Sequence, residues 1–75
     1  MAHKYYQFDY AEMSGFEIKS LGIINLQSAR DISRENLKDV ARKHLQVPDA
    51  NIVISNVAKL TKTEFEEMKE SQVTY

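Results

Sequence analysis

The segment IKSLGIINL, residues 18–26, limits the possible folds of this chain more than any other stretch. As a strand it carries large aliphatic side chains on both faces, because successive side chains point to opposite sides of a sheet. One face would hold Ile18, Ile24 and Leu26, and the other Leu21 and Ile23. A chain of 75 residues has few helices with which to cover two sheet faces, so the cover of the second face becomes the central question.

The middle of this segment can be interpreted in two ways. Ser20 and Gly22 are small, and on the face of Ile18 and Ile24 they would leave room for a crossing helix. Alternatively, a bulge at Gly22 changes the alternation and turns Leu21 or Ile23 inward. Without that bulge, the second face of the strand stays apolar.

Period-two alternation also predicts a strand at residues 4–10, where Tyr6, Phe8 and Tyr10 share one face. A five-residue loop, AEMSG, would join it to a second strand at 16–26, which makes a β-hairpin. The run NIVISNV at 51–57 predicts a third strand, and its consecutive Ile52, Val53 and Ile54 are typical of a strand buried on both sides.

Two helices are predicted. From Ser33, which can cap the first turn, apolar residues follow helical spacing: Leu37, Val40, Ala41, His44 and Leu45. Thr61 and Glu64 have the spacing of a capping box, and Leu60 and Phe65 that of a hydrophobic staple, which predicts a short helix at about 62–70. The tail 71–75 has little to hold it and is expected to fray.

The expected fold is therefore one α+β domain over residues 1–75, in the order strand–strand–helix–strand–helix. We expect a three-stranded, mainly antiparallel sheet with one long helix packed on one face and a short C-terminal helix. The third strand can pair with the first or with the second, and pairing with the first makes better use of the aromatic row of the first strand.

Composition excludes several classes of protein. The chain has no cysteine, so disulfides and thiolate metal sites are excluded, and two histidines leave few ligands for zinc. Ten basic and eleven acidic side chains give a net charge of −1, which indicates neither a non-specific nucleic-acid binder nor an acidic mimic of DNA. The first ten residues contain no apolar run that predicts a signal peptide or a membrane span, so we expect a cytoplasmic protein.

No catalytic site, cofactor site or metal site is predicted. The serines lie outside any glycine elbow, and two glycines seven positions apart cannot form a phosphate-binding loop. His44 is interpreted as a boundary residue at a helix C-terminus. His3 and Asp9 would lie roughly 20 Å apart along a strand, too far to share a metal ion. We therefore expect a protein that is not an enzyme.

The expected site is a protein-interaction surface on the face of the sheet away from the long helix. Its candidate residues are Tyr5, Leu21, Ile23, Val53, Phe65 and Met68. The short terminal helix offers only two large apolar side chains, so it is not expected to cover this face completely. Exposed contiguous apolar area in a small domain usually marks an interface, here with a protein partner or a second copy in a homodimer.

A nucleic-acid-associated function is the alternative, and it would use a basic helix flank. The candidate residues are Arg34, Lys38, Arg42, Lys59 and Lys62. Glu35 and Asp39 lie beside this flank at spacings that favour ion pairs, so a solvated helix face is the better interpretation.

The layout of a Tyr/Phe-alternating strand, a glycine-containing hairpin, ISRENLKDVARKHL and NIVISNVAKL resembles small uncharacterised proteins of phages and mobile elements in Gram-positive bacteria. The resemblance covers residues 5–60 in layout. It implies stoichiometric binding of a host protein, as anti-defence inhibitors do, and it implies no functional residue. The acidic excess of DNA-mimicking inhibitors is absent from this chain.

Overall fold

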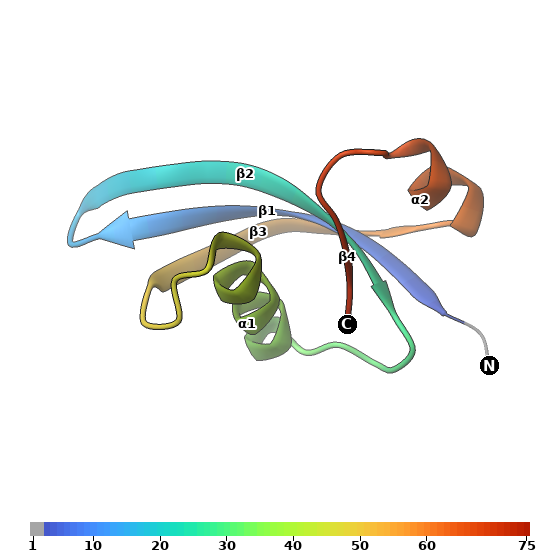
Figure 1. Cartoon of the computed structure of the whole chain (residues 1–75), viewed down its shortest axis with the longest axis horizontal. Helices are drawn as coiled ribbons and strands as arrows, with labels where there is room; N and C mark the ends of the chain where they lie inside the picture. The colour runs from blue at the N-terminus through green and yellow to red at the C-terminus, as the bar shows by residue number, and fades with distance from the viewer. Residues whose placement is uncertain (1–2) are drawn as a thin grey trace.

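Four strands and two helices make up residues 3–75, the part of the chain that the computed structural model describes (Figure 1). In chain order they are β1 (Lys4–Ser14), β2 (Glu17–Ser28), α1 (Arg34–Leu45), β3 (Asn51–Leu60), α2 (Lys62–Glu67) and β4 (Gln72–Thr74). The strands form one sheet in the order β3-β1-β2-β4. α1 lies on one side of this sheet and α2 on the other (Figure 1).

The α+β class, the chain order up to α2 and the place of β3 beside β1 are confirmed. Both β2 and β3 run antiparallel to β1. Two parts of the predicted fold are wrong: the sheet has four strands instead of three, and both helices are short, with 12 and 6 residues. The predicted domain also includes Met1 and Ala2, which lie outside the described residues.

The hairpin between β1 and β2 is closed by two residues, Gly15 and Phe16, and not by the predicted five-residue loop. Ser14 pairs directly with Glu17, because the alternation of β1 continues through Ala11 and the residues after it. Gly15 has a φ of 62°, and a positive φ at the first of two loop residues is the type II′ arrangement that suits twisted strands. The strands therefore run to the tip, and the hairpin projects beyond α1 (Figure 1).

The bulge considered at Gly22 is absent. Pairing of β1 with β2 is continuous from Lys4 opposite Ser28 to Glu12 opposite Ser20, and the register shifts only after that pair. Gly22 instead allows a close approach: an added Cβ would lie 2.6 Å from Cζ of Tyr10, well inside van der Waals contact. Leu26, Ile24 and Gly22 therefore share the face that meets α1.

The register shift lies at Lys19, the extra residue between the pairs of β2 with Glu12 and Met13. As a result, Ile18 pairs with Met13 and joins the face that carries Leu21. The expectation that Ile18 shares a face with Ile24 is therefore wrong, because one bulged residue inverts the alternation beyond it.

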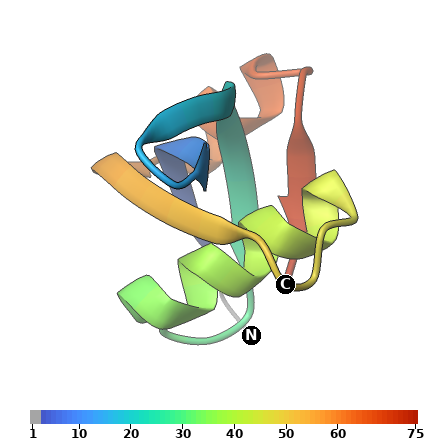
Figure 2. The same cartoon turned by 90° about the vertical axis from the view of Figure 1, so that its left-hand side faces the viewer.

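The core lies between the sheet and α1. Strand side chains with no exposed surface, such as Phe8, Ile24 and Leu26, meet the buried stripe of α1, which consists of Leu37, Val40 and Ala41. Figure 2 shows α1 crossing the sheet instead of following its strands. Ser33 caps α1 as predicted, since its side chain accepts from the backbone N–H of Asn36.

The tail that was expected to fray forms β4 at residues 72–74, which pairs with β2 in parallel. The backbone N–H of Tyr75 donates to the carbonyl of Gln27 at 2.8 Å, and that of Asn25 donates to the carbonyl of Ser71 at 3.0 Å. The guanidinium of Arg30 lies 5.1 Å from the centre of the Tyr75 ring. Main-chain pairing and one aromatic anchor therefore hold a tail that contains a single aliphatic residue, Val73.

Candidate protein-interaction surface

Part of the sheet opposite α1 remains uncovered, and its side chains are apolar. Ala11 of β1 lies opposite both Leu21 of β2 and Val53 of β3, so these three form a row across the sheet. Leu21 is 68% exposed, and Ile23 and Val53 are each 50% exposed. We call the surface formed by Ala11, Leu21, Ile23 and Val53 the open face.

The other end of the same side is covered by α2. Thr61 and Glu64 form the predicted capping box, which starts the helix at Lys62, and the helix ends at Glu67 instead of continuing to about residue 70. Phe65 is 6% exposed, and its ring centre lies 5.0 Å from that of Tyr5. Six residues of helix therefore seal one end of this side and leave the open face bare.

The six predicted interface residues thus fall into two groups. Leu21, Ile23 and Val53 are exposed and come together on the open face. Phe65 is buried against Tyr5, so its side chain serves as cover for the sheet and is not available as a contact surface. Met68 is half-buried, and its sulfur accepts from Nε2 of Gln7 at 3.7 Å.

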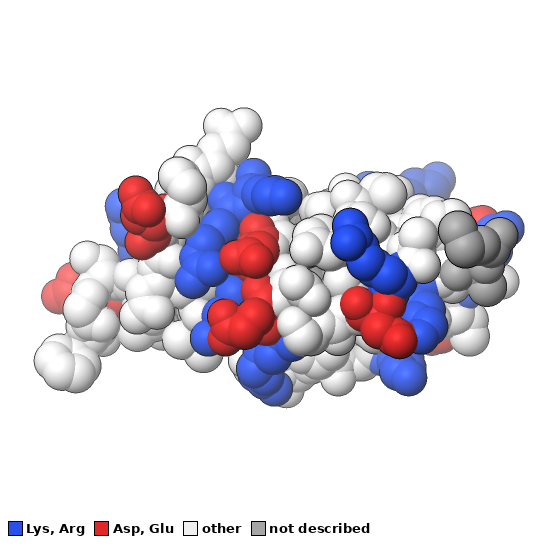
Figure 3. Space-filling view, turned by 90° about the horizontal axis from the view of Figure 1, so that it is seen from below, with Lys and Arg blue, Asp and Glu red and all other residues white. Residues whose placement is uncertain are grey.

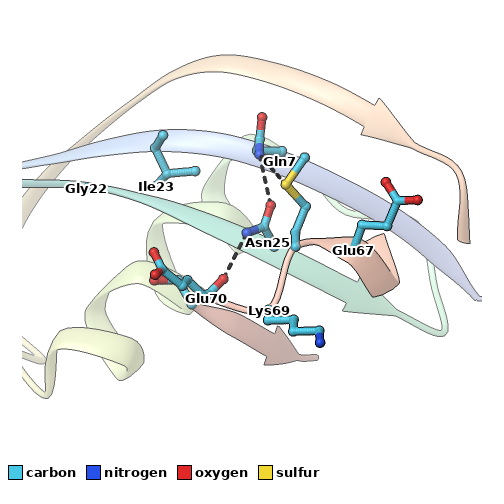
Figure 4. A pocket seen from close by; sticks show the side chains of 9 residues that line it. Gln7, Gly22, Ile23, Asn25, Glu67, Lys69 and Glu70 are labelled. Carbon is cyan, nitrogen blue, oxygen red and sulfur yellow. Dashed lines mark hydrogen bonds between the residues drawn. The ribbon is translucent and has the colours of Figure 1, made fainter. Parts of the chain in front are cut away.

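Two neighbouring hollows follow the open face and share Gly22 and Ile23. One, of about 370 Å³, lies over the row of Ala11, and the other, of about 700 Å³, lies between the sheet and residues 67–71. Figure 4 shows Ile23 and Gln7 on the sheet side of the second hollow, with Glu67, Lys69 and Glu70 around it. We call the two hollows together the groove.

A buried amide fixes the wall of the groove. Asn25 is 5% exposed, its Oδ1 accepts from Nε2 of Gln7 at 3.0 Å, and its Nδ2 donates to the carbonyl of Glu70 at 2.9 Å (Figure 4). These bonds tie the segment after α2 to the middle of the sheet. Asn25 is not among the residues predicted from the sequence, and its only signal there is a polar residue inside the apolar run IINL.

Carboxylates outnumber cations along the groove. Of the described residues that line it, Asp9, Glu67 and Glu70 are acidic and Lys69 is basic. Asp9 lies on β1 next to Ala11 on the same face, and its carboxylate accepts from Nδ2 of Asn56 at 2.6 Å. The groove therefore combines an apolar floor with an acidic border.

The basic flank of α1 is engaged within the molecule. Nη1 of Arg34 donates to the carbonyl of Ile54 at 2.7 Å, and Nε of Arg42 donates to that of Ala50 at 2.9 Å. Lys38 forms an ion pair with Glu35 at 3.4 Å, and Arg42 forms one with Asp39 at 3.0 Å. The two hydrogen bonds fasten α1 to β3 and to the loop before it, and the two ion pairs lie within α1.

The predicted basic residues also do not form one surface. Arg34, Lys38 and Arg42 lie on α1, whereas Lys62 begins α2 on the other side of the sheet (Figure 1). Lys59 lies on β3, near Asp31. The hydrogen bond and ion pair with Lys4 lower the pKa of the Asp31 carboxyl, and the charge of Lys59 adds a smaller effect in the same direction. Figure 3 shows acidic and basic side chains interspersed on the α1 side of the molecule. This arrangement gives no support to nucleic-acid binding.

The histidine on α1 has a packing role, because the ring of His44 meets that of Tyr10 edge-on with the centres 6.4 Å apart.

Among residues 3–75, no group of three or more metal-ligating side chains gathers. Neither helix of this part of the chain has the length and apolar character of a membrane span. Comparison of the chain with protein-family models, with curated proteins and with solved structures found no match, so a functional assignment rests on the geometry of the open face and the groove.

Proposed function

We propose that this chain is a non-catalytic protein-interaction module that binds a protein surface stoichiometrically through its open face. The observation that carries the proposal is the exposure of Leu21, Ile23 and Val53, at 68%, 50% and 50%, on one face of the sheet, where Ala11 of β1 lies between Val53 and the two residues of β2. Contiguous exposed aliphatic side chains of this kind mark interfaces, because leaving them in water costs stability.

The energy available from covering this face is considerable for a chain of this length. Complete burial of an aliphatic side chain contributes about 1.5–3 kcal/mol, so covering three that are half-exposed or more would contribute about 3–5 kcal/mol from this side alone. The whole stability of a small domain is of the order of 5–15 kcal/mol. A partner that covers the open face would therefore stabilise the folded chain by binding to it.

The resemblance to small proteins of phages and mobile elements supports one form of this activity. In that form the chain acts in the cytoplasm, without a cofactor, and inhibits a host system by occupying one of its proteins. Self-association through the same face is the other form, and the two differ in the mass of the purified protein.

The test is the double substitution Leu21→Asp with Ile23→Asp. Because both side chains are exposed, this variant should keep its far-UV circular dichroism and cooperative unfolding, and it should lose self-association by light scattering or capture of the partner from host lysate. The matched control is Phe16→Asp with Val57→Asp, which places the same charges on side chains that are 105% and 41% exposed outside the open face.

The control should behave as the unsubstituted chain does. Unfolding of the Leu21→Asp/Ile23→Asp variant would show that both residues belong to the core and would refute the proposal. Equal association of the two variants and the unsubstituted chain would refute it as well.

A further inference from the structure

The uncovered part of the sheet has the dimensions of one helix. It spans three strands, which places β2 and β3 about 10 Å apart, and it runs for about 13 Å along β1 from Met13 to Asp9. An α-helix with its side chains is about 10–12 Å wide. One helix lying next to α2 would therefore complete the layer on this side, as α1 does on the other.

The floor of the groove is shaped to receive apolar side chains. Ala11 stands in the middle of its row, and the larger Leu21 and Val53 rise on the two sides of it, where they line the hollow of about 370 Å³. An aliphatic side chain entering from above would sit over Ala11 and touch both neighbours. Side chains at helical spacing can supply two or three such contacts along the face.

The border of the groove selects the charge of its occupant. Glu67 and Glu70 are exposed on the α2 side, and Asp9 lies at the end of the open face, against one basic lining residue, Lys69. Complementary charge favours a cationic occupant, since like charges brought together across an interface cost free energy. A second copy would bring the same acidic border against this one.

We propose that the occupant of the open face is a cationic amphipathic helix of another protein. Its apolar stripe would contact Leu21, Ile23 and Val53, and its Lys or Arg flank would face Glu67 and Glu70. This inference rests on the proposed function and states the chemistry of the partner at that same surface.

The experiment uses the full chain and two synthetic helical peptides. The first is a labelled peptide of about 20 residues, longer than the peptides whose isolated helices are marginal in water, with leucine at helical spacing and lysine elsewhere. The second has glutamate in place of each lysine. Fluorescence anisotropy should show binding of the Leu/Lys peptide that weakens as salt is raised, and much weaker binding of the Leu/Glu peptide.

Two kinds of variant locate the binding. Glu67→Gln with Glu70→Gln should weaken binding of the Leu/Lys peptide about five-fold, since each exposed ion pair contributes modestly. The matched charge control, Glu17→Gln with Asp49→Asn, removes two exposed carboxylates that do not line the groove and should change the affinity less than two-fold.

Leu21→Asp with Ile23→Asp should abolish binding of the Leu/Lys peptide. These substitutions add negative charge, so the loss cannot come from weaker attraction of the lysines. Leu21→Thr with Ile23→Thr places a β-branched residue at both positions of β2 and should give the same loss in a chain with normal strand propensity.

Three results would overturn the inference: equal binding of the two peptides, binding that survives both substitutions of Leu21 and Ile23, or equal weakening by the charge control. A dimer that Leu21→Asp/Ile23→Asp breaks would also overturn it, because the occupant would then be a second copy. Such a dimer would leave the proposed function in place. The proposed function itself is refuted if the Leu21→Asp/Ile23→Asp variant keeps both self-association and partner capture.

Discussion

Ile23 and Ile24 are consecutive residues of β2 with the same side chain, and they allow the two faces of the sheet to be compared directly. Ile24 is 0% exposed in the core and Ile23 is 50% exposed on the open face. At about 0.8 kcal/mol per buried methylene, the carbon atoms lost in Ile24→Ala account for about 2.4 kcal/mol, and the cavity raises the loss of stability to roughly 3–4 kcal/mol.

Ile23→Ala removes the same atoms from a side chain that is half in water, and no closed cavity forms. Its cost should therefore be about 1 kcal/mol. Urea denaturation followed by circular dichroism measures both, and the midpoints should shift with little change in slope. A larger loss for Ile23→Ala would mean that the faces of β2 are inverted, and equal losses would mean that the open face is buried as well. Either result would contradict the account.

Three further predictions concern the close approach at Gly22, the groove wall at Asn25 and the exposed ion pair of Asp31. Gly22→Ala should lower stability by about 1–2 kcal/mol, because its Cβ would meet the Tyr10 ring, and a gain in the urea midpoint would contradict this close approach. Asn25→Ala should cost about 1–3 kcal/mol and speed amide hydrogen exchange in β4, since the carbonyl of Glu70 loses its donor; unchanged exchange would show that β4 does not depend on Asn25. The ion pair with Lys4 lowers the pKa of Asp31, so its contribution is present above the ordinary range of aspartate and is lost as pH falls through the lowered pKa. NMR titration should show that pKa move back toward its ordinary range in Lys4→Met, and no change would argue that the pair does not form in solution.

Strong periodicity explains which elements could be predicted from the sequence. The aromatic row Tyr6, Phe8 and Tyr10 and the helical stripe from Leu37 to Ala41 each follow one period over several residues, and both lie in the core. The capping residues Ser33 and Thr61 were identified because capping depends on a local spacing of three residues.

The elements that were missed depend on backbone pairing and not on periodicity. β4 has one aliphatic residue, Val73, and its position depends on hydrogen bonds with β2 that no hydrophobic pattern reveals. The bulge at Lys19 is likewise set by the tight turn at Gly15, which fixes the register from the tip.

The candidate surface was predicted only in part, because some of it depends on strand alternation and some on how the segment after β3 folds back. Alternation along β2 and β3 places Leu21, Ile23 and Val53 on one side of the sheet, as strand geometry requires. Their exposure does not follow from alternation, and the 50% exposure of Val53 shows that β3 is not buried on both sides as its apolar run suggested. The burial of Phe65 against Tyr5 depends on how α2 returns to the sheet, and the acidic border depends on the course of residues 67–71 after it. Neither the fold of that segment nor its anchor at Asn25 is encoded in a local period.

The most direct test of an uncovered apolar face is solvent paramagnetic relaxation of methyl groups, measured with a soluble gadolinium chelate at a concentration where light scattering gives the monomer mass. The account predicts strong relaxation at the methyl groups of Leu21, Ile23 and Val53 and little at those of Ile24 and Leu26, whose side chains have no exposed surface. Methyl groups of Leu21 and Ile23 that are as protected in the monomer as that of Ile24 would contradict it.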